Sequence, residues 1–178
     1  CVQGGPLDLG FARQERTELT EAFIAAGEEM GIPRVEDLNH LGQEGVGYPT
    51  RTIHKGRRQS AAEAFLTPAR RRENLTIETG VTIDRVLFDG RRAVGVAGAG
   101  GGAAIEYRTE GEIILAAGAL LSPQILERSG VGQGARLSGL GIDVVHDSPE
   151  VGENMLEHRL LMMQYNLLKP WSQNADFR

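Results

Sequence analysis

Small residues that follow a long apolar run mark the place where this sequence is best suited to hold a ligand. The run Ile113–Ala117 predicts a strand covered on both faces, and it leads through Gly118 into a helix predicted to begin at Ser122 and Pro123. Open α/β sheets bind ligands at the carboxyl ends of their strands, where small residues leave room. Close packing of the helix against the strand would favour the same residues, so the pattern alone leaves both interpretations open.

Two other short motifs indicate structure more than chemistry. Ser122 has the hydroxyl of a nucleophile, but no Gly-x-Ser-x-Gly turn surrounds it and Pro123 follows, so a helix-capping role is predicted. The glycines of Gly130–Gly134 follow a predicted helix instead of a strand, and they lack the spacing of a phosphate-binding turn. This segment is therefore predicted to end a helix and form a turn.

The histidine and charged residues show no arrangement typical of a metal or anion site. Glu28 and Glu29 are adjacent on a predicted helix face exposed to water, and Arg70–Arg72 are interpreted as a solvated run rather than an anion site. Four histidines form no i, i+4 pair and no group with cysteine: His40, His54, His146 and His158. No metal-ligating residue is therefore predicted.

The overall composition is typical of a globular protein in water. The 178 residues are 40% hydrophobic and 24% charged, and the formal net charge of −5 gives no electrostatic reason to bind nucleic acid or an anionic membrane. No apolar run approaches the roughly 20 residues of a membrane span. The lone Cys1 permits no internal disulfide, so a reducing, cytoplasmic compartment is predicted. Because the sequence does not begin with Met, it is expected to be part of a longer polypeptide.

Helical and loop signals alternate in the first 70 residues. Apolar residues at helical spacing predict a helix from Thr17 to Gly31, followed by a surface loop over 42–56. Ser60 and Glu63 have the pattern of a capping box at the start of a second helix, which Pro68 is expected to end or kink.

Alternating apolar residues and turn signals predict an antiparallel meander in the middle of the chain. Asp89-Gly90 is a favoured hairpin turn, and the glycine-rich run 98–102 predicts a loose outer connection. The predicted strands are 74–78, 81–88, 93–96 and 105–108.

The remaining elements follow the small-residue segment. Gly130 is predicted to end the first helix, Ala135–Leu140 to form another, and Ile142–Val145 to return as a strand. A change of composition near Val151 is interpreted as a domain crossing, and Arg159–Leu168 is an apolar stretch that favours strand.

The segment Gly118–Gly132 closely resembles the second sequence signature of the glucose-methanol-choline (GMC) oxidoreductases. The resemblance covers nearly the whole chain and is weakest before Thr17 and after Leu168. Other segments that resemble the family follow in the same order: Gly56–Ser60, Phe65-Leu66, Asn74–Ile77, Arg85–Leu87, Ala93–Val96, Leu140–Ile142 and Val151–Asn154.

The resemblance implies an α/β fold, α+β in part. An incomplete FAD-binding doubly wound domain would carry a β-meander and lead into the start of an antiparallel-sheet substrate domain. The implied boundaries are a substrate-side or cap-side segment at 1–55, part of the FAD-binding domain at 56–150, and the start of the substrate-binding domain at 151–178. The implied partners are a small-molecule alcohol and the remainder of the same polypeptide.

Four residues match family positions near the cofactor FAD. By this resemblance, Ile83 offers backbone groups to the adenine, and Ala117 and Gly118 lie where the strand end approaches the cofactor. Ser122 caps the signature helix. These assignments are implied by position in the family's motifs.

The resemblance assigns no catalytic residue. Asn154 and His158 match the family's motif at the crossing toward the substrate domain, with Glu157 where Asp is usual. The family's Gly-x-Gly-x-x-Gly motif and its catalytic histidine region have no counterpart in these 178 residues. His158 matches a different motif and is therefore not assigned the catalytic role.

The implied reaction is hydride transfer from the carbon of a primary or secondary alcohol to the flavin. A flavin-containing lyase of the same family is an alternative, because it would keep the fold without net redox chemistry. A non-catalytic binding module derived from the fold is another, because the cofactor-anchoring motif is missing. The sequence leaves open the alcohol, the electron acceptor and the oligomeric state.

Overall fold

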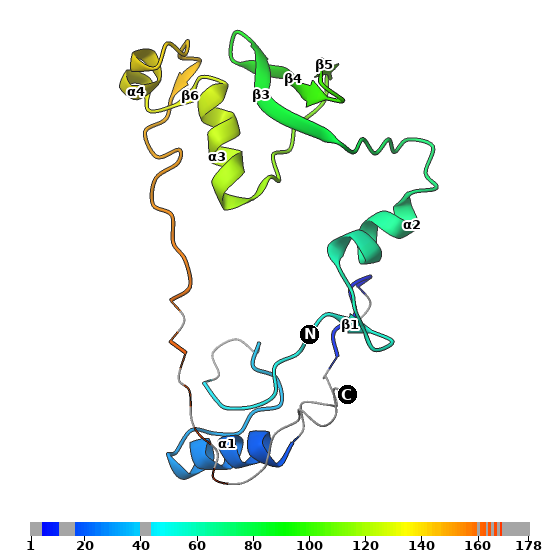
Figure 1. Cartoon of the computed structure of the whole chain (residues 1–178), viewed down its shortest axis with the longest axis vertical. Coiled ribbons are helices and arrows are strands. Elements are labelled where there is room, and N and C mark those ends of the chain that lie inside the picture. Colours follow the sequence, from blue (N-terminus) through cyan, green and yellow to red (C-terminus); the bar gives the residue numbers. More distant parts are fainter. Residues whose placement is uncertain are drawn as a thin grey trace. The chain divides into compact units, whose positions relative to one another are not determined.

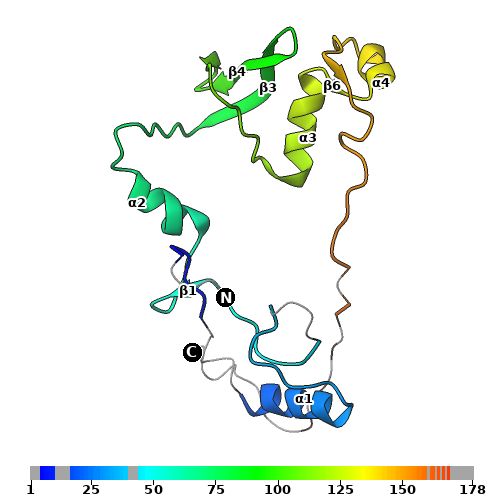
Figure 2. The same ribbon diagram turned by 180° about the vertical axis from the view of Figure 1, so that it is seen from behind.

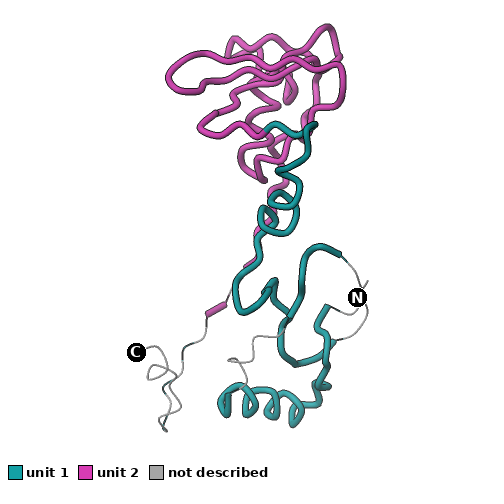
Figure 3. The backbone as a smooth tube through the Cα atoms, turned by 90° about the vertical axis from the view of Figure 1, so that its right-hand side faces the viewer, with its two compact units in different colours: residues 1–76, 163–178 teal, residues 77–162 magenta. Residues whose placement is uncertain are grey.

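The computed structural model describes residues 5–10, 17–39 and 44–159, together with residues 161, 162, 164, 166 and 168 (Figure 1). The chain divides into two compact units, one formed by residues 1–76 and 163–178 and the other by residues 77–162 (Figure 3). Each unit is described by itself. The predicted apolar stretch 159–168 lies only partly within the described residues, and His40 and Cys1 lie outside them.

The first unit contains short elements joined by loops. They are helix α1 (Glu18–Glu29), strands β1 (Ile53–His54) and β2 (Arg57–Arg58), the π-helical turn η2 (Ala62–Leu66) and helix α2 (Thr67–Ala69). The last residues of the region predicted as a surface loop, 42–56, therefore include β1, which pairs antiparallel with β2.

Helix α1 confirms the helix predicted from Thr17 to Gly31. Thr17 is its N-cap and accepts a hydrogen bond from the amide of Thr20 at 3.2 Å. Ile24, only 1% exposed, is the buried residue of its apolar face. Arg34 donates a hydrogen bond to Glu21 at 2.9 Å, and this bond together with the carboxylate's charge raises the pKa of the guanidinium.

The second helix begins as the capping-box pattern predicts. The amide of Glu63 donates to Ser60 Oγ at 3.2 Å. The π-helical turn η2 follows, and the amide of Thr67 after it donates to the carbonyl of Ala62. Helix α2 then ends at Ala69, one residue after Pro68. Proline cannot donate a backbone hydrogen bond, which agrees with the expected disturbance at this point.

The strand predicted at 74–78 is wrong. These residues have no strand pairing in the structure, and the amide of Leu75 closes a turn with the carbonyl of Arg72. Alternating side chains favour an extended backbone, but a strand also needs a neighbour to accept its hydrogen bonds.

The second unit contains the meander and the helices that follow it (Figures 1 and 2). Its elements are β3 (Val81–Asp89), β4 (Arg92–Gly100), β5 (Ala103–Arg108), α3 (Gly118–Arg128), β6 (Val131–Gly132), α4 (Gly134–Gly139) and β7 (His146–Asp147). Strands β3, β4 and β5 form an antiparallel sheet in that order, which confirms the predicted meander.

Tight turns join the strands of the meander. Gly90 has a φ of +57° beside the pair Asp89 and Arg92, which confirms Asp89-Gly90 at the hairpin tip. Between β4 and β5 the turn is only Gly101-Gly102, so the glycine-rich run predicted as a loose connection is mostly part of β4. Although glycine has no side chain to pack, its backbone can still pair in a strand when the strands on both sides supply hydrogen bonds.

Two strands predicted after the meander differ from the structure. Residues 113–117 form no strand, and Ile114 is 82% exposed, because no described segment lies beside them as a pairing partner. The strand predicted at Ile142–Val145 is displaced: β7 begins at His146 and pairs parallel with β6. The amides of Val145 and His146 both donate to the carbonyl of Gly130, which places the start of pairing there.

Helix α3 begins earlier than predicted. Its first residue is Gly118, and both Ser122 and Pro123 lie inside it, so the start predicted at Ser122 and Pro123 is wrong. The boundary was predicted too late because proline is most common in the first turn of a helix, whereas here Pro123 lies further inside. The helix ends at Arg128 with Ser129 as its C-cap, and Gly130, whose φ is +84°, follows as the predicted helix-ending residue. Helix α4 confirms the helix predicted at Ala135–Leu140.

Candidate functional site

A cavity of about 380 Å³ lies between the meander, the segment that leads into α3, and α3 itself. This volume is within the roughly 300–1,000 Å³ of small-molecule sites. Most of its wall is apolar side chain and backbone. The lining residues are Ile83, Gly95, Val96, Tyr107, Arg108, Thr109, Glu112, Ile113, Ile114, Leu115, Ala116, Ala117 and Ile125.

The cavity brings together two of the four predicted cofactor-binding residues. Ile83 on β3 and Ala117 before α3 are 34 positions apart in sequence, yet both line it. Gly118 and Ser122 lie in the first turns of α3 and are not among the lining residues. Contact with a cofactor stays a prediction for all four.

A bulge in β3 sets the position of Ile83. Ile83 pairs with Gly98 and Arg85 with Ala97, so Asp84 is an extra residue on β3. Such bulges bend a strand and redirect its side chains. A Cβ atom on Gly98 would collide with the carbonyl oxygen of Thr82, so this close approach of the two strands requires glycine.

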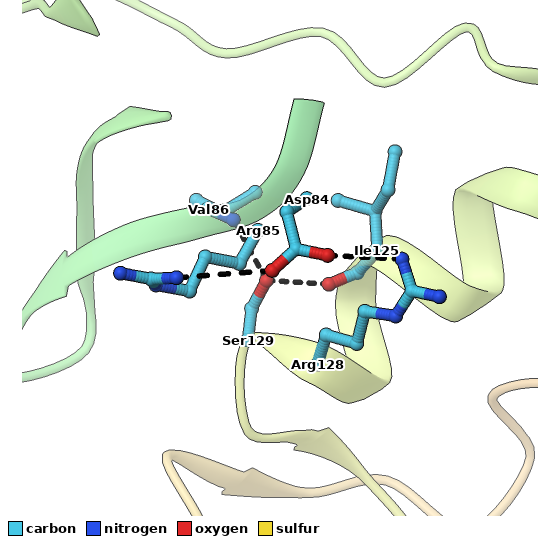
Figure 4. A network of polar contacts seen from close by, with 6 residues as sticks. All are labelled: Asp84, Arg85, Val86, Ile125, Arg128 and Ser129. Carbon is cyan, nitrogen blue, oxygen red and sulfur yellow. Dashed lines mark hydrogen bonds and ion pairs between the residues drawn. The ribbon is translucent and has the colours of Figure 1, made fainter. Parts of the chain in front are cut away.

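A polar network fastens this part of β3 to the end of α3 (Figure 4). Ser129 Oγ accepts a hydrogen bond from the amide of Val86 at 2.8 Å and donates to the carbonyl of Ile125. Arg128 donates to the carboxylate of Asp84 at 3.0 Å. The network therefore contacts β3 at the bulge and two residues beyond it.

The two contacts of this network differ in their exposure to water. Ser129 is 8% exposed, whereas the side chains of Arg128 and Asp84 are 52% and 49% exposed. Exposed ion pairs contribute about 0–1 kcal/mol. Leaving a buried amide without a partner costs about 1–3 kcal/mol, so the serine contact is the stronger restraint.

The sequence prediction missed Ser129 as a positioning residue. It lies within the signature segment but was interpreted only as part of a helix end. Ser129 follows Ile125 by four positions, so the two share the helix face that packs on β3. A polar residue in that apolar face, directly before a helix-ending glycine, is the available signal.

The start of α3 is held by Ser122. Its Oγ accepts a hydrogen bond from the amide of Ala117 at 3.1 Å. Ala117 is the N-cap residue, so Ser122 satisfies an amide at the helix start from within the helix instead of capping it by position. Gly118 has a φ of +89°, and nothing lies within 4 Å of a Cβ atom built there. The space beside Gly118 is therefore open.

Residues next to the crossing motif line a separate cavity of about 560 Å³ beside α3, whereas Asn154 and His158 are not among its lining residues. Gly152, with a φ of +85°, approaches the carboxylate of Glu127, which is paired with Arg136. Asn154 has a φ of +55° and donates to Glu150 at 2.6 Å. His158 is exposed and gives no geometric reason to act as a catalytic base.

Two of the three described histidines lie against single charged residues. His54 is paired with Asp8, and His146 Nδ1 lies 2.7 Å from Arg91. Within the described ranges, no three or more His, Cys, Asp or Glu side chains lie close enough to hold a metal ion. None of the helices in the described part of the chain has the length and apolar character of a membrane span.

The residues of the 380 Å³ cavity fit one end of FAD. Its apolar wall suits a flat heterocycle such as adenine, and Arg108 is its only lining cation among the described residues. Diphosphate binding typically uses backbone amides of a glycine-rich turn at a helix start. These 178 residues contain no Gly-x-Gly-x-x-Gly sequence, so the fit applies to the adenine end.

Comparison with known proteins supports the resemblance to the GMC oxidoreductases. The family model described as GMC oxidoreductase matches residues 5–160. The oxygen-dependent choline dehydrogenase of Pectobacterium atrosepticum is 47% identical over 169 residues, and that of Pseudomonas putida strain KT2440 is 46% identical over 171 residues. Each match covers 94% of this chain and 30% of the relative, so the chain spans less than a third of their length.

Solved structures resemble the chain over most of its length. Pyridoxine 4-oxidase from Mesorbium loti is 38% identical with a TM-score of 0.73, covering 83% of this chain and 29% of that one. An FAD-dependent oxidoreductase from Chaetomium thermophilum is 30% identical with a TM-score of 0.76, covering 82% and 26%. These neighbours confirm the mixed α/β fold class and FAD as the cofactor of the group.

Sequence, fold and comparisons therefore agree. The signature segment forms α3 and its flanking turns, and the family model extends over nearly all described residues. The resemblance expected from the sequence is confirmed: this chain belongs to the GMC oxidoreductase family.

Proposed function

We propose that this chain is part of an FAD-dependent oxidoreductase that transfers hydride from a primary or secondary alcohol to the flavin. The observation that supports this most directly is the shared cavity of Ile83 and Ala117, built against the signature helix. The similarity to choline dehydrogenases makes choline the first alcohol to test.

In this proposal the chain's own residues bind and orient the adenine end of FAD. The backbone of Ile83 lies beside the adenine edge, and Ile125 and the apolar residues of 113–117 exclude water from the ring. The open space beside Gly118 admits the cofactor near the helix start. When bound, the flavin supplies the hydride-accepting chemistry.

The domain assignment is part of the proposal. Residues 56–150 contribute to the FAD-binding domain, 151–178 begin the substrate-binding domain, and 1–55 lie on its substrate or cap side. The remainder of the polypeptide supplies the diphosphate-binding turn and the catalytic histidine. The cytoplasmic location inferred from the lone cysteine stays a prediction.

Anaerobic reduction of the full-length protein tests the proposal. Choline, added without oxygen to protein that contains FAD, is expected to bleach the flavin's visible absorbance. A protein that retains FAD but is not bleached by choline or by a series of simple alcohols would support the lyase alternative instead. A purified full-length protein that binds no flavin would support the binding module.

A further inference from the structure

We infer that Ser129 is a positioning residue for the adenine end of the site, acting through β3. This inference rests on the proposed function, because it concerns how Ile83 is presented to FAD. Ser129 does not line the 380 Å³ cavity itself. Its effect would be transmitted through the strand that carries Ile83.

The hydroxyl of Ser129 joins two elements at a buried point. It accepts from the amide of Val86 and donates to the carbonyl of Ile125, so its one proton and one of its two lone pairs are used. Val86 is 5% exposed and Ile125 7% exposed, so water has little access to either group. The contact links positions 43 residues apart.

This contact bears on Ile83 because it joins two walls of the cavity. Ile83 lines the cavity from β3, and Ile125, whose carbonyl accepts from Ser129, lines it from α3. Val86, whose amide donates to Ser129, follows Ile83 by three positions, beyond the bulge at Asp84. The hydroxyl therefore holds the part of β3 that carries Ile83 against α3.

The ion pair between Arg128 and Asp84 acts at the bulge itself but is exposed. It is expected to support the same packing of β3 on α3 weakly. Opposite the bulge, Gly98 permits the close approach of the two strands without specifying which β3 residue is the extra one. Among these features, the buried serine is the one whose loss would loosen the packing of β3 on α3 most.

Binding measurements on the full-length apoprotein test the inference. FAD affinity is measured by quenching of flavin fluorescence, and ADP is titrated as a competitor that has the adenosine and diphosphate of FAD without the flavin. Ser129→Ala is expected to raise the dissociation constants of FAD and ADP by a similar factor, about tenfold, which corresponds to about 1.4 kcal/mol. Ser129→Thr retains the hydroxyl and is expected to restore affinity to within about threefold, or about 0.65 kcal/mol.

Two further variants keep the result interpretable. Ser138→Ala makes the same change at an exposed serine of α4 and is expected to leave both dissociation constants unchanged. Ser129→Cys keeps a side chain of the same shape with a weaker donor and acceptor, and it replaces Ser129→Ala if that variant does not fold, with the same direction expected.

The outcomes separate the inference from the proposed function. An unchanged ADP affinity in folded Ser129→Ala, even with a lower melting temperature, would overturn the positioning role and leave only a structural one. A loss of FAD affinity without a loss of ADP affinity would also overturn it. If ADP fails to compete with FAD in the unaltered protein, the adenine site of the proposed function is wrong instead.

Discussion

Replacing Gly118 by valine isolates the effect of the helix start on cofactor binding. Gly118 has a φ of +89°, in the left-handed region that disfavours side chains. A Cβ atom there would meet nothing within 4 Å, so the variant introduces backbone strain without a collision. Gly101, in the β4 to β5 turn, has a φ of +58° and the same open surroundings. Gly101→Val is therefore a matched control.

The expected magnitude follows from this strain. Holding a non-glycine residue in the left-handed region costs roughly 1–2 kcal/mol. If FAD binding requires the conformation of Gly118, the cost falls on binding, and affinity drops by about 5–30-fold. In Gly101→Val the strain lies in an outer turn away from the cavity lining. Its cost would lower stability while leaving FAD affinity within about twofold of the original, or about 0.4 kcal/mol.

The assay is an FAD titration of the full-length apoprotein, followed by flavin fluorescence, with urea unfolding of the same samples. A loss of FAD affinity with little loss of stability is expected for Gly118→Val, and a loss of stability with little loss of FAD affinity is expected for Gly101→Val. Equal FAD affinity in Gly118→Val and Gly101→Val would refute the placement of FAD beside Gly118.

Three other changes test separate parts of the structure. Ile24→Ala is expected to lower the free energy of unfolding by about 2–5 kcal/mol, because this side chain is 1% exposed, whereas Phe23→Ala at a 71% exposed position should change it by less than about 1 kcal/mol in urea unfolding. Arg128→Ala is expected to cost at most about 1 kcal/mol, an effect that high salt would reduce; a salt-independent loss of several times that size would contradict its assignment as an exposed pair. The 178-residue chain alone is expected to bind FAD weakly in equilibrium dialysis, because the diphosphate anchor is missing; tight binding would show that another segment supplies it.

Local signals predicted the elements whose hydrogen bonds are local. The helix after Thr17 and the hairpin at Asp89-Gly90 each satisfy their backbone groups within a short stretch, so capping and turn residues were sufficient to find them. The strand expected at Ile113–Ala117 depends on neighbours that the described residues do not provide. Its apolar pattern is that of a strand inside a sheet in which the neighbouring strands are present.

The candidate site was predicted only in part for the same reason. Small residues at Ala117 and Gly118 indicated a ligand from local pattern alone, and family resemblance added Ile83. The bulge at Asp84 depends on pairing with β4, and the contact of Ser129 with β3 depends on packing between a strand and a helix far apart in sequence. No short-range signal defines such a contact, because its register is fixed by tertiary structure.

The meander has a consequence for the order in which this part of the chain can fold. Two tight turns join its three strands, so only short loops have to close before the sheet can form. Docking of α3 through Ser129 closes a separation of 43 residues and has a larger entropic cost. We therefore expect β3, β4 and β5 to pair first and α3 to dock afterwards. On that order, pairing with β4 would set the register of β3, and Ser129 would join the finished sheet to α3 only in the later step.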